Sequence, residues 1–438
     1  MSSLNIISEN NNVFEPSASC ALSGVFLGAN SFKNSSLFVH ASSGCGFAMR
    51  YGLGQHWKSF MVCPVSSMCD DNIIFGSKKL LSDSLEKFLK IHDSEVVFVG
   101  TGCSASIIGE DYISVTEHFS KKYNKPIVFI DSGGLTGDLV RGYDVFLTNV
   151  TKYFSDAHIE YDFSESIDIC GIIPMYDIFW RGNISELKRL FSILDIKINS
   201  FYTGDVGFNE IQKIYYSNLV VSINYLVGKR TLSLLKNKFD VSVEQHSYYP
   251  IGINNTVRFL ESICSKLGKN DMYKEIILHE KNIAQKTIKR GFDFSKVMFS
   301  SGRFALIGDA TKIIPMTDFL LNELGMQCVM IAFTNKVSEN ILLDLETVLK
   351  NGCLNLQNIV VLNGEDNHFI RKMLNELQPN VVFGRSIDRT LNDKKVVHVT
   401  WHFPASDNFL VYDRPIIGFK GVTSIVDYIV NGFCKIWY

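Results

Sequence analysis

The chain has 438 residues, of which 46% are hydrophobic and 20% charged, and this composition can bury the cores of about three domains. The formal net charge of −2 provides no basic field for nucleic acid and no polybasic stretch for an anionic membrane surface. No signal-peptide pattern and no membrane-spanning apolar run is found, so we expect a cytoplasmic protein. Ten cysteines fit a reducing compartment, where clustered thiols more often serve metal or redox chemistry than disulfides.

The hydrophobic pattern alternates short β-branched runs with amphipathic helices, which is typical of parallel sheets covered by helices on both faces. From the spacing of apolar residues we predict, in chain order, helix 81–89, strand 96–99, helix 108–119, strand 127–130, strand 167–173, helix 187–194, strand 219–223, strand 303–308, helix 316–324, strand 327–333, strand 381–383 and strand 396–400. We therefore expect an α/β fold of three Rossmann-like domains with parallel sheets flanked by helices, at 1–160, 161–295 and 296–438, with a helix at the C-terminus.

Several nucleotide and metal signatures are missing from the sequence. Gly228-Lys229 has Ile223 where a phosphate-binding loop needs its first glycine, so we expect no ATP hydrolysis by this chain. The turn Gly308–Thr311 lacks the G-x-G-x-x-G pattern, so the expected Rossmann-like topology does not imply a bound dinucleotide. H-E-x-x-H and C-x-x-C are also absent.

Three cysteines have local settings that suit a metal cluster. Cys45 follows an apolar run and stands between two glycines, which let the backbone approach a bulky group. Cys103 ends the stretch Gly100–Cys103 between a strand and a helix, where exposed amides and the helix dipole stabilise a thiolate. Cys20 lies in the entry segment. Spacing alone favours buried packing over ligation for thiols so far apart in sequence.

Longer motifs around these cysteines resemble a known family. The stretches Cys20–Val25 and Phe38–Cys45 resemble the paired cysteine motifs of the nitrogenase molybdenum–iron protein family, the nitrogenase component 1 type oxidoreductases. Thr101–Cys103 with Ile108–Asp111 resembles the third cysteine motif of that family. Four further stretches are similar to its β-like subunits in particular: Val62–Met68, Ile74–Gly76, Phe403–Asp407 and Pro415–Gly421. The resemblance runs in order over nearly the whole chain.

The resemblance implies that Cys20, Cys45 and Cys103 are thiolate ligands of an iron–sulfur cluster at a subunit interface. Three ligands from one chain leave a shared cluster to be completed by a partner, so we expect an α-like subunit in an α2β2 assembly, or a homodimer. The resemblance also implies that a separate ATP-dependent iron protein delivers electrons to the cluster. Neither nucleic acid nor a membrane is expected as a partner.

One loop departs from the family pattern. Where β subunits have a serine that can join an eight-iron cluster, this chain reads Asp131–Leu135, and the best match for that serine is Gly134. We therefore favour a [4Fe–4S] cluster over an eight-iron P-cluster. Ser132 is close enough in sequence to leave the number of irons open.

Other cysteines and histidines allow metal interpretations, but structural roles are favoured. Cys63 and Cys69 are near each other in sequence, yet Cys63 corresponds to a family cysteine that is not one of the three ligands. Cys170 has apolar neighbours and indicates core packing. His40 belongs to the first cysteine motif and is expected to form hydrogen bonds near the cluster. His402 is expected to be a structural histidine at the end of a strand.

The function that follows is that of an electron-transferring oxidoreductase subunit. Its substrate is not specified by the sequence, because relatives in this family reduce molecules as different as dinitrogen and a tetrapyrrole double bond. A scaffold for assembly of a metal cofactor is the alternative, and a cluster-free binding protein is a third. We also expect no molybdenum–iron cofactor on this chain, because the segments 224–229 and 244–250 provide no anchoring cysteine.

Overall fold

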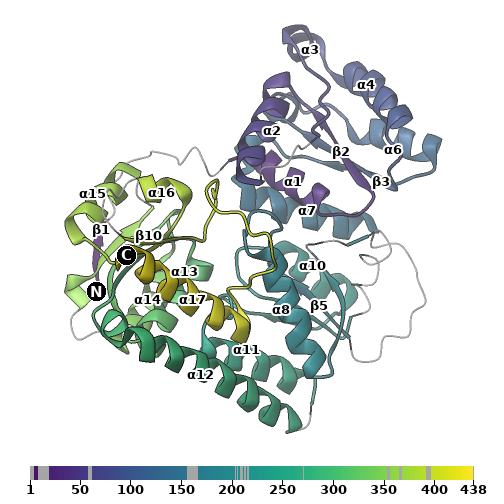
Figure 1. Ribbon diagram of the computed structural model, residues 1–438. Coiled ribbons are helices and arrows are strands. Elements are labelled where there is room, and N and C mark those ends of the chain that lie inside the picture. The colour runs from purple at the N-terminus through teal and green to yellow at the C-terminus, as the bar shows by residue number, and fades with distance from the viewer. Residues whose placement is uncertain are drawn as a thin grey trace. The chain divides into compact units, whose positions relative to one another are not determined.

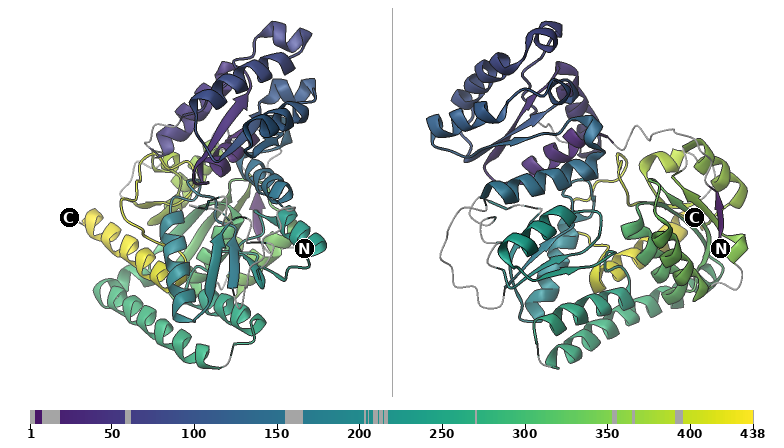
Figure 2. Two further views of the ribbon diagram at one scale, coloured as in Figure 1. Left: turned by 90° about the vertical axis from the view of Figure 1, so that its right-hand side faces the viewer. Right: turned by 180° about the vertical axis from the view of Figure 1, so that it is seen from behind.

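The computed structural model describes residues 4–7, 19–57, 62–154, 166–202, 204, 206–207, 211, 214, 217–269, 271–352, 356–364, 367–390 and 396–437. The backbone divides into two compact units. The cysteine unit comprises Ala18–Met175 and Lys197–Gln245, and the C-terminal unit comprises Tyr176–Ile196 and His246–Tyr438 with the N-terminal strand. Every strand pairing among the described residues is parallel, and helices flank each of three sheets (Figures 1 and 2), so the predicted α/β class is confirmed.

The first sheet of the cysteine unit has the strand order β2-β3-β4, with β2 at Ser35–His40, β3 at Val96–Thr101 and β4 at Ile127–Ile130. Its helices are α1 (Ala21–Asn30), α4 (Lys78–Ile91), α6 (Ile113–Tyr123) and α7 (Leu139–Phe154). Apolar residues of α4 and α6 pack with Val97 and Val99 in one core cluster. Phe98 points the opposite way, and its ring lies 4.9 Å from that of Phe146 on α7. All of β3 is buried because helices cover both faces.

Further helices lie in the segments between the strands of this sheet. The helix predicted over 108–119 is two helices, because Gly109 takes a left-handed conformation and ends α5 (Cys103–Ile108) before α6 begins at Ile113. The segment between β2 and α4 contains α2 (Ser43–Trp57) and α3 (Asp70–Phe75).

The second sheet of the cysteine unit has the order β6-β5-β7-β8. Its strands are β5 (Ser166–Cys170), β6 (Lys197–Phe201), β7 (Leu219–Ser222) and β8 (Val243–Gln245), and α10 (Lys229–Phe239) connects the last two. Asp168 on β5 is fully buried and accepts hydrogen bonds from the hydroxyls of Ser200 and Ser217. The N–H of Gly228, before α10, donates to Oδ1 of Asp144 on α7 over 2.9 Å, which ties the two sheets of the unit together.

The C-terminal unit has one six-stranded sheet with the order β1-β11-β10-β9-β12-β13. Its strands are β1 (Asn5–Ile7), β9 (Arg303–Gly308), β10 (Gln327–Phe333), β11 (Val360–Asn363), β12 (Val381–Gly384) and β13 (Val397–Thr400). Two of these strands, β9 and β10, have the bounds that the sequence predicted. The beginning of the chain joins this sheet, since β1 pairs with Val360–Leu362.

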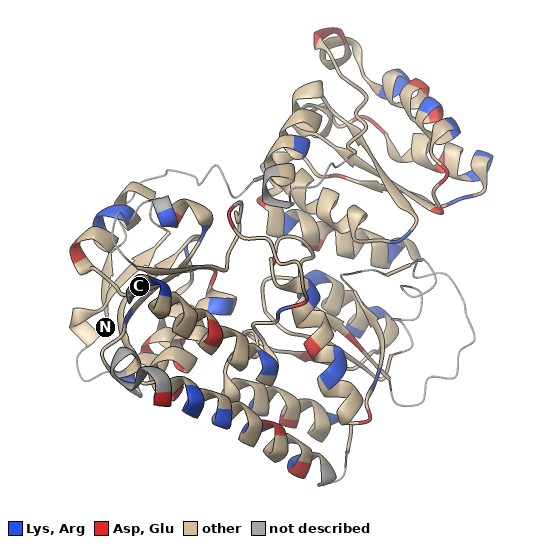
Figure 3. Cartoon of the chain, in the orientation of Figure 1, with Lys and Arg blue, Asp and Glu red and all other residues tan. Residues whose placement is uncertain are grey.

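Helices surround the sheet of the C-terminal unit. They are α8 (Trp180–Ile193), α11 (Ile253–Lys266), α12 (Met272–Ser300), α13 (Ala310–Asp318), α14 (Glu339–Lys350), α15 (Asn367–Leu377), α16 (Ser386–Thr390) and α17 (Gly418–Trp437). The helix predicted over 316–324 begins earlier, as α13, and continues as a π-helical turn over Phe319–Glu323. Exposed helices such as α4 and α12 carry both signs of charge interleaved (Figure 3). Among the described residues, no helix combines the length and apolarity needed to cross a membrane.

Candidate functional site

Three turns at one edge of the first sheet carry the cysteines that the sequence singled out. Because β2, β3 and β4 are parallel, their carboxyl ends meet at the same edge. Cys45 lies in the first turn of α2, shortly after β2, and Cys103 is the first residue of α5, shortly after β3. Cys20 is the N-cap residue of α1. Cys103 is exposed, and the other two are half-buried.

The loop after β4 brings Cys103 and Cys20 together. The backbone N–H of Gly134 donates a hydrogen bond to Sγ of Cys103 over 3.3 Å. A methyl group on Gly134 would lie 3.1 Å from that sulfur and 3.4 Å from Cβ of Cys20. The two cysteines therefore flank the same glycine.

Cys45 joins the group through the turn that precedes Cys103. A methyl group on Gly102 would lie 3.4 Å from Sγ of Cys45 and 2.5 Å from Cβ of Ala41, so only glycine lets these two turns approach so closely. Burial raises the pKa of the Cys45 thiol, the hydroxyl of Ser42 lowers it, and the charges of Cys103 and Cys20 raise it further. The structure thus brings all three predicted cysteines to one place.

Hydrogen bonds fix the loop that carries Gly134. Asp131 accepts hydrogen bonds from the hydroxyls of Thr101, over 2.8 Å, and Ser106, over 2.5 Å. The hydroxyl of Ser132 donates to the backbone carbonyl of Thr101 over 2.9 Å and is fully buried. The loop after β4 is therefore held to the end of β3, beside Cys103.

Close packing of two helices positions Cys20. A methyl group on Gly24 of α1 would lie 2.0 Å from the backbone oxygen of Leu139, and one on Gly142 of α7 would lie 1.8 Å from that of Ala21. The N–H of Ala21 donates to the carbonyl of Gly137 over 3.0 Å. The N-terminus of α1, and with it Cys20, is therefore fixed against the start of α7.

The donor set at this edge is three thiols, the ligand type that iron–sulfur clusters take. Within the described parts of the chain, no three His, Cys, Asp or Glu side chains are placed to hold one metal ion. A single-ion site needs its thiolates about 2.3 Å from one point, whereas the thiolates of a cluster bind different irons. The glycines leave room beside the sulfurs of Cys45 and Cys103, and the amide of Gly134 stabilises negative charge on the latter.

Comparison with known proteins identifies the family. The sequence profile described as nitrogenase component 1 type oxidoreductase matches residues 20–434. The chain belongs to this family. The nitrogenase molybdenum–iron protein β chain of Methanococcus maripaludis is 26% identical over 472 residues, which cover 100% of this chain and 98% of the relative. That of Sinorhizobium fredii is 23% identical over 445 residues, which cover 96% and 84%.

The fold of nitrogenase component 1 proteins is also seen in a solved structure. The structure titled "Nitrogenase Cp1 at pH 6.5" matches with a TM-score of 0.81 at 17% sequence identity, covering 98% of this chain and 95% of that chain. The resemblance read from the cysteine motifs is thereby confirmed, as is the fold class. By its family, the chain is an oxidoreductase-type subunit.

The histidine of the first family motif has a structural place. His40 is fully buried, and its Nδ1 and Nε2 lie 2.9 Å from the hydroxyl of Ser66 and 3.0 Å from that of Ser77. Burial lowers the pKa of His40 to about 4, although the carboxylate of Glu110 raises it. Both ring nitrogens are engaged, so His40 connects the end of β2 to the segment that leads into α4.

The other residues considered from the sequence have their own structural surroundings. Cys63 is buried, and burial raises its pKa to about 12, with a further rise from nearby Cys45. Cys69 is exposed, with its Sγ 3.1 Å from Oδ1 of Asn72. His402 lies in the C-terminal unit, buried, with Nδ1 3.4 Å from Oδ2 of Asp309.

Sequence reasoning missed the residues that make room for the three cysteines. Gly102, Gly24 and Gly142 have no reactive group of their own, yet each permits a close approach on which the site depends. A glycine next to or four residues after a motif cysteine was the available signal. It could not be read as a packing contact before the partner segment was known.

Proposed function

We propose that this chain is the β-like subunit of a nitrogenase-like oxidoreductase in which Cys20, Cys45 and Cys103 hold an iron–sulfur cluster shared with a partner subunit. The cluster relays electrons from an ATP-hydrolysing iron protein to a substrate or cofactor. The meeting of three thiols around Gly102 and Gly134 carries the proposal. When bound, the cluster supplies one-electron redox chemistry.

The residues of this chain have separate roles in that proposal. The three thiolates bind iron, and the two glycines keep side chains away from the volume that the cluster needs. The amide of Gly134 donates to the sulfur of Cys103, and such hydrogen bonds raise the reduction potential because they stabilise the added negative charge. The hydroxyl of Ser42, 3.8 Å from Sγ of Cys45, acts in the same direction on a second ligand.

The same loop supports a four-iron cluster over an eight-iron one. The position nearest to the sulfur of Cys103 in this loop is Gly134, which has no side chain to offer as a further ligand. The hydroxyl of Ser132 is buried and donates to the carbonyl of Thr101, so it is directed into the fold. A [4Fe–4S] cluster is therefore the form we propose.

An exposed apolar surface beside the cysteines supports a partner subunit. We name it the apolar rim, and it consists of Phe47, Tyr51, Ile74, Phe75, Ile107 and Leu135. Phe75 is 84% exposed and Leu135 is 82% exposed, although side chains of this kind gain about 1.5–3 kcal/mol each from burial. These residues follow Cys45, Cys103 and Gly134 closely in sequence or lie on α3, which contacts α5.

Such a surface marks a protein interaction site. The occupant we propose is an α-like subunit of the same family, in an α2β2 assembly, since the relatives above are β chains. A homodimer is the other outcome of the test. A partner seated on the rim supplies the remaining cluster ligands and shields the cluster from water.

A scaffold for assembly of a metal cofactor is the second candidate function. It uses the same three thiols, and the exposure of Cys103 favours it, because a cluster that is handed on must be reached by an acceptor. The two functions separate by the fate of the cluster. An enzyme subunit keeps its cluster while reduced iron protein and ATP change its oxidation state, whereas a scaffold transfers iron to an acceptor chain.

Anaerobic purification with and without a candidate α-like chain tests the proposal. We expect about four irons and four sulfides per shared cluster, and loss of both in Cys20→Ser, Cys45→Ser and Cys103→Ser. Cys69→Ser is the matched control, because this thiol is exposed and contacts Asn72 instead. Undiminished iron in all three variants would falsify the ligand assignment.

Electron paramagnetic resonance then separates the two functions. With reduced iron protein and ATP, the relay predicts a change in the cluster signal while the iron content of the chain stays constant. Loss of iron to an acceptor chain, without a redox change, would instead support the scaffold.

A further inference from the structure

The C-terminal unit holds a polar pocket of about 740 Å³ beside β13. Because β13 is the last strand of its sheet, Val396–Thr400 line the pocket along an open strand edge. The opposite wall is α17, which comes close to the strand because a methyl group on Gly432 would lie 2.3 Å from Cγ1 of Val397. The volume is within the range of small-molecule sites.

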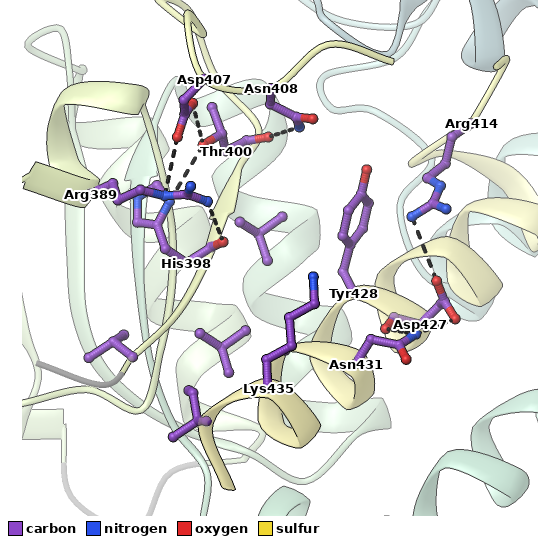
Figure 4. Close-up of a pocket in the computed structure, with 15 residues that line it drawn as sticks. Arg389, His398, Thr400, Asp407, Asn408, Arg414, Asp427, Tyr428, Asn431 and Lys435 are labelled. Carbon is purple, nitrogen blue, oxygen red and sulfur yellow. Dashed lines mark hydrogen bonds and ion pairs between the residues drawn. The ribbon is translucent and has the colours of Figure 1, made fainter. Parts of the chain in front are cut away.

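The carboxylates of the pocket are already paired with arginines. Nε of Arg389 lies 3.2 Å from Oδ2 of Asp407, and Nη1 of Arg414 lies 3.6 Å from Oδ2 of Asp427. Lys435 extends from α17 into the space between these two pairs (Figure 4). None of the described carboxylates pairs with Lys435, so the lining has one positive charge more than it has negative charges.

A neutral histidine belongs to the wall of the pocket. Nδ1 of His398 lies 3.5 Å from the hydroxyl of Thr400, and its Nε2 is buried without a hydrogen-bond partner in the described part of the chain. Burial lowers the pKa of His398 to about 4, and the charge of Arg389 lowers it further, so the ring is uncharged at pH 7. Because its Nε2 is buried, the ring contributes neither a charge nor an accessible hydrogen-bonding nitrogen to the pocket.

The other side of the pocket offers a ring and a second cation. The guanidinium of Arg414 stacks 4.6 Å from the centre of the Tyr428 ring, which fixes both side chains. Figure 4 shows Tyr428 and Lys435 on α17, across the pocket from Asn408 and from the strand that carries His398. A ligand between these walls meets the ring of Tyr428 and the ammonium of Lys435, which pairs with none of the described carboxylates.

We propose that this pocket binds a small organic anion with one carboxylate or phosphate group, which pairs with Lys435. One anionic group matches the single excess charge of the lining. The inference goes beyond the electron relay, because it assigns a metabolite site to the C-terminal unit and uses none of the cysteines.

Two pairs of probes that differ in charge test the site on the full chain by calorimetry. They are adenosine monophosphate against adenosine, and benzoate against benzamide, and they separate phosphate from carboxylate recognition. We expect at least one anion to bind about tenfold or more tightly than its neutral partner, because one charge-assisted hydrogen bond usually contributes about that much affinity. Lys435→Met should abolish this difference.

Lys420→Met is the matched control, because Lys420 is an exposed lysine on the same helix that does not line the pocket. It should leave all affinities unchanged. Failure of both anions to bind at concentrations up to about 10 mM, equal binding of anion and neutral partner, or equal effects of the two lysine variants would overturn the proposal.

Discussion

The backbone amide of Gly134 donates to the sulfur of Cys103 over 3.3 Å, at a position where the first atom of any side chain would lie 3.1 Å from that sulfur. The same glycine adjoins Cβ of Cys20. One residue without a side chain therefore separates two of the three thiols and provides a hydrogen bond to one of them. The consequences of this relationship can be measured.

Gly134→Ala should lower the iron content of anaerobically purified protein by half or more, because its methyl group occupies the volume next to Cys103 and Cys20. Gly134 does not have a positive φ, so alanine fits the backbone and the folded chain should lose no more than about 1 kcal/mol of stability. Iron analysis and thermal unfolding of the same preparations provide the measurement.

The control for this variant is Gly52→Ala on α2, where a methyl group would meet nothing within 4 Å. It should keep its iron and gain about 0.5–1 kcal/mol in stability, since alanine is the better helix residue. Equal iron contents in the two variants would show that the space beside Gly134 is not needed.

Gly24→Ala should destabilise the cysteine unit by about 3 kcal/mol or more, because its methyl group would lie 2.0 Å from the backbone oxygen of Leu139 and α1 must move away from α7. Cys20 caps α1, so the variant should also lose iron under conditions in which it is still folded. Urea unfolding followed by circular dichroism gives the stability. A stability within about 0.5 kcal/mol of the wild type would contradict the close packing of these helices.

The buried His40 should make the cysteine unit sensitive to acid. Burial lowers its pKa from 6.5 to about 4, so between these values the unfolded chain binds a proton that the folded chain excludes. The stability that the neutral ring contributes is therefore present above about pH 6.5 and lost as the pH falls toward 4, with a magnitude of up to about 3 kcal/mol. His40→Gln should flatten this part of the profile of unfolding free energy against pH.

Asp168 changes the stability with pH in the opposite direction. The unfolding free energy of His40→Gln must therefore be compared with that of the wild type at each pH. Burial raises the pKa of Asp168 to about 6, although the hydroxyls of Ser200 and Ser217 lower it, and its contribution to stability is lost as the pH rises from about 4 to 6. The exposed His118→Gln serves as the control and should keep the wild-type profile. Parallel profiles for His40→Gln and the wild type would refute the assignment of this acid sensitivity to His40.

Phe75→Ser should weaken association with the partner subunit while leaving the fold intact. The side chain is 84% exposed, so its removal costs little in the isolated chain, whereas in a complex it removes about 1.5–3 kcal/mol of burial. Sedimentation velocity of mixtures with the α-like chain should show dissociation constants raised by about tenfold or more. Val411→Ser, an equally exposed apolar position in the C-terminal unit, is the control. An equal loss of affinity in both variants would show that the apolar rim is not the interface.

Much of the fold could be predicted from the sequence because parallel strands that are buried on both faces leave a continuous apolar run. The strands 303–308 and 327–333 have the predicted bounds for this reason. The division between α5 and α6 was missed, because Ile108 and Phe119 keep helical spacing across a turn that Gly109 closes with a left-handed backbone. Apolar spacing shows which side of a segment is buried, and it does not show where the backbone breaks.

The sequence by itself determined the family, the α/β class and which three cysteines are candidate ligands, because short motifs keep their residues in order along the chain. Whether these thiols bind iron stays a prediction. Only the tertiary structure decided that Gly134 lies against Cys103 and Cys20, that His40 is held by two serines, and that the first strand pairs with Val360–Leu362. These contacts join segments far apart in sequence, and the free energy that selects them comes from packing of whole elements, which no local pattern records.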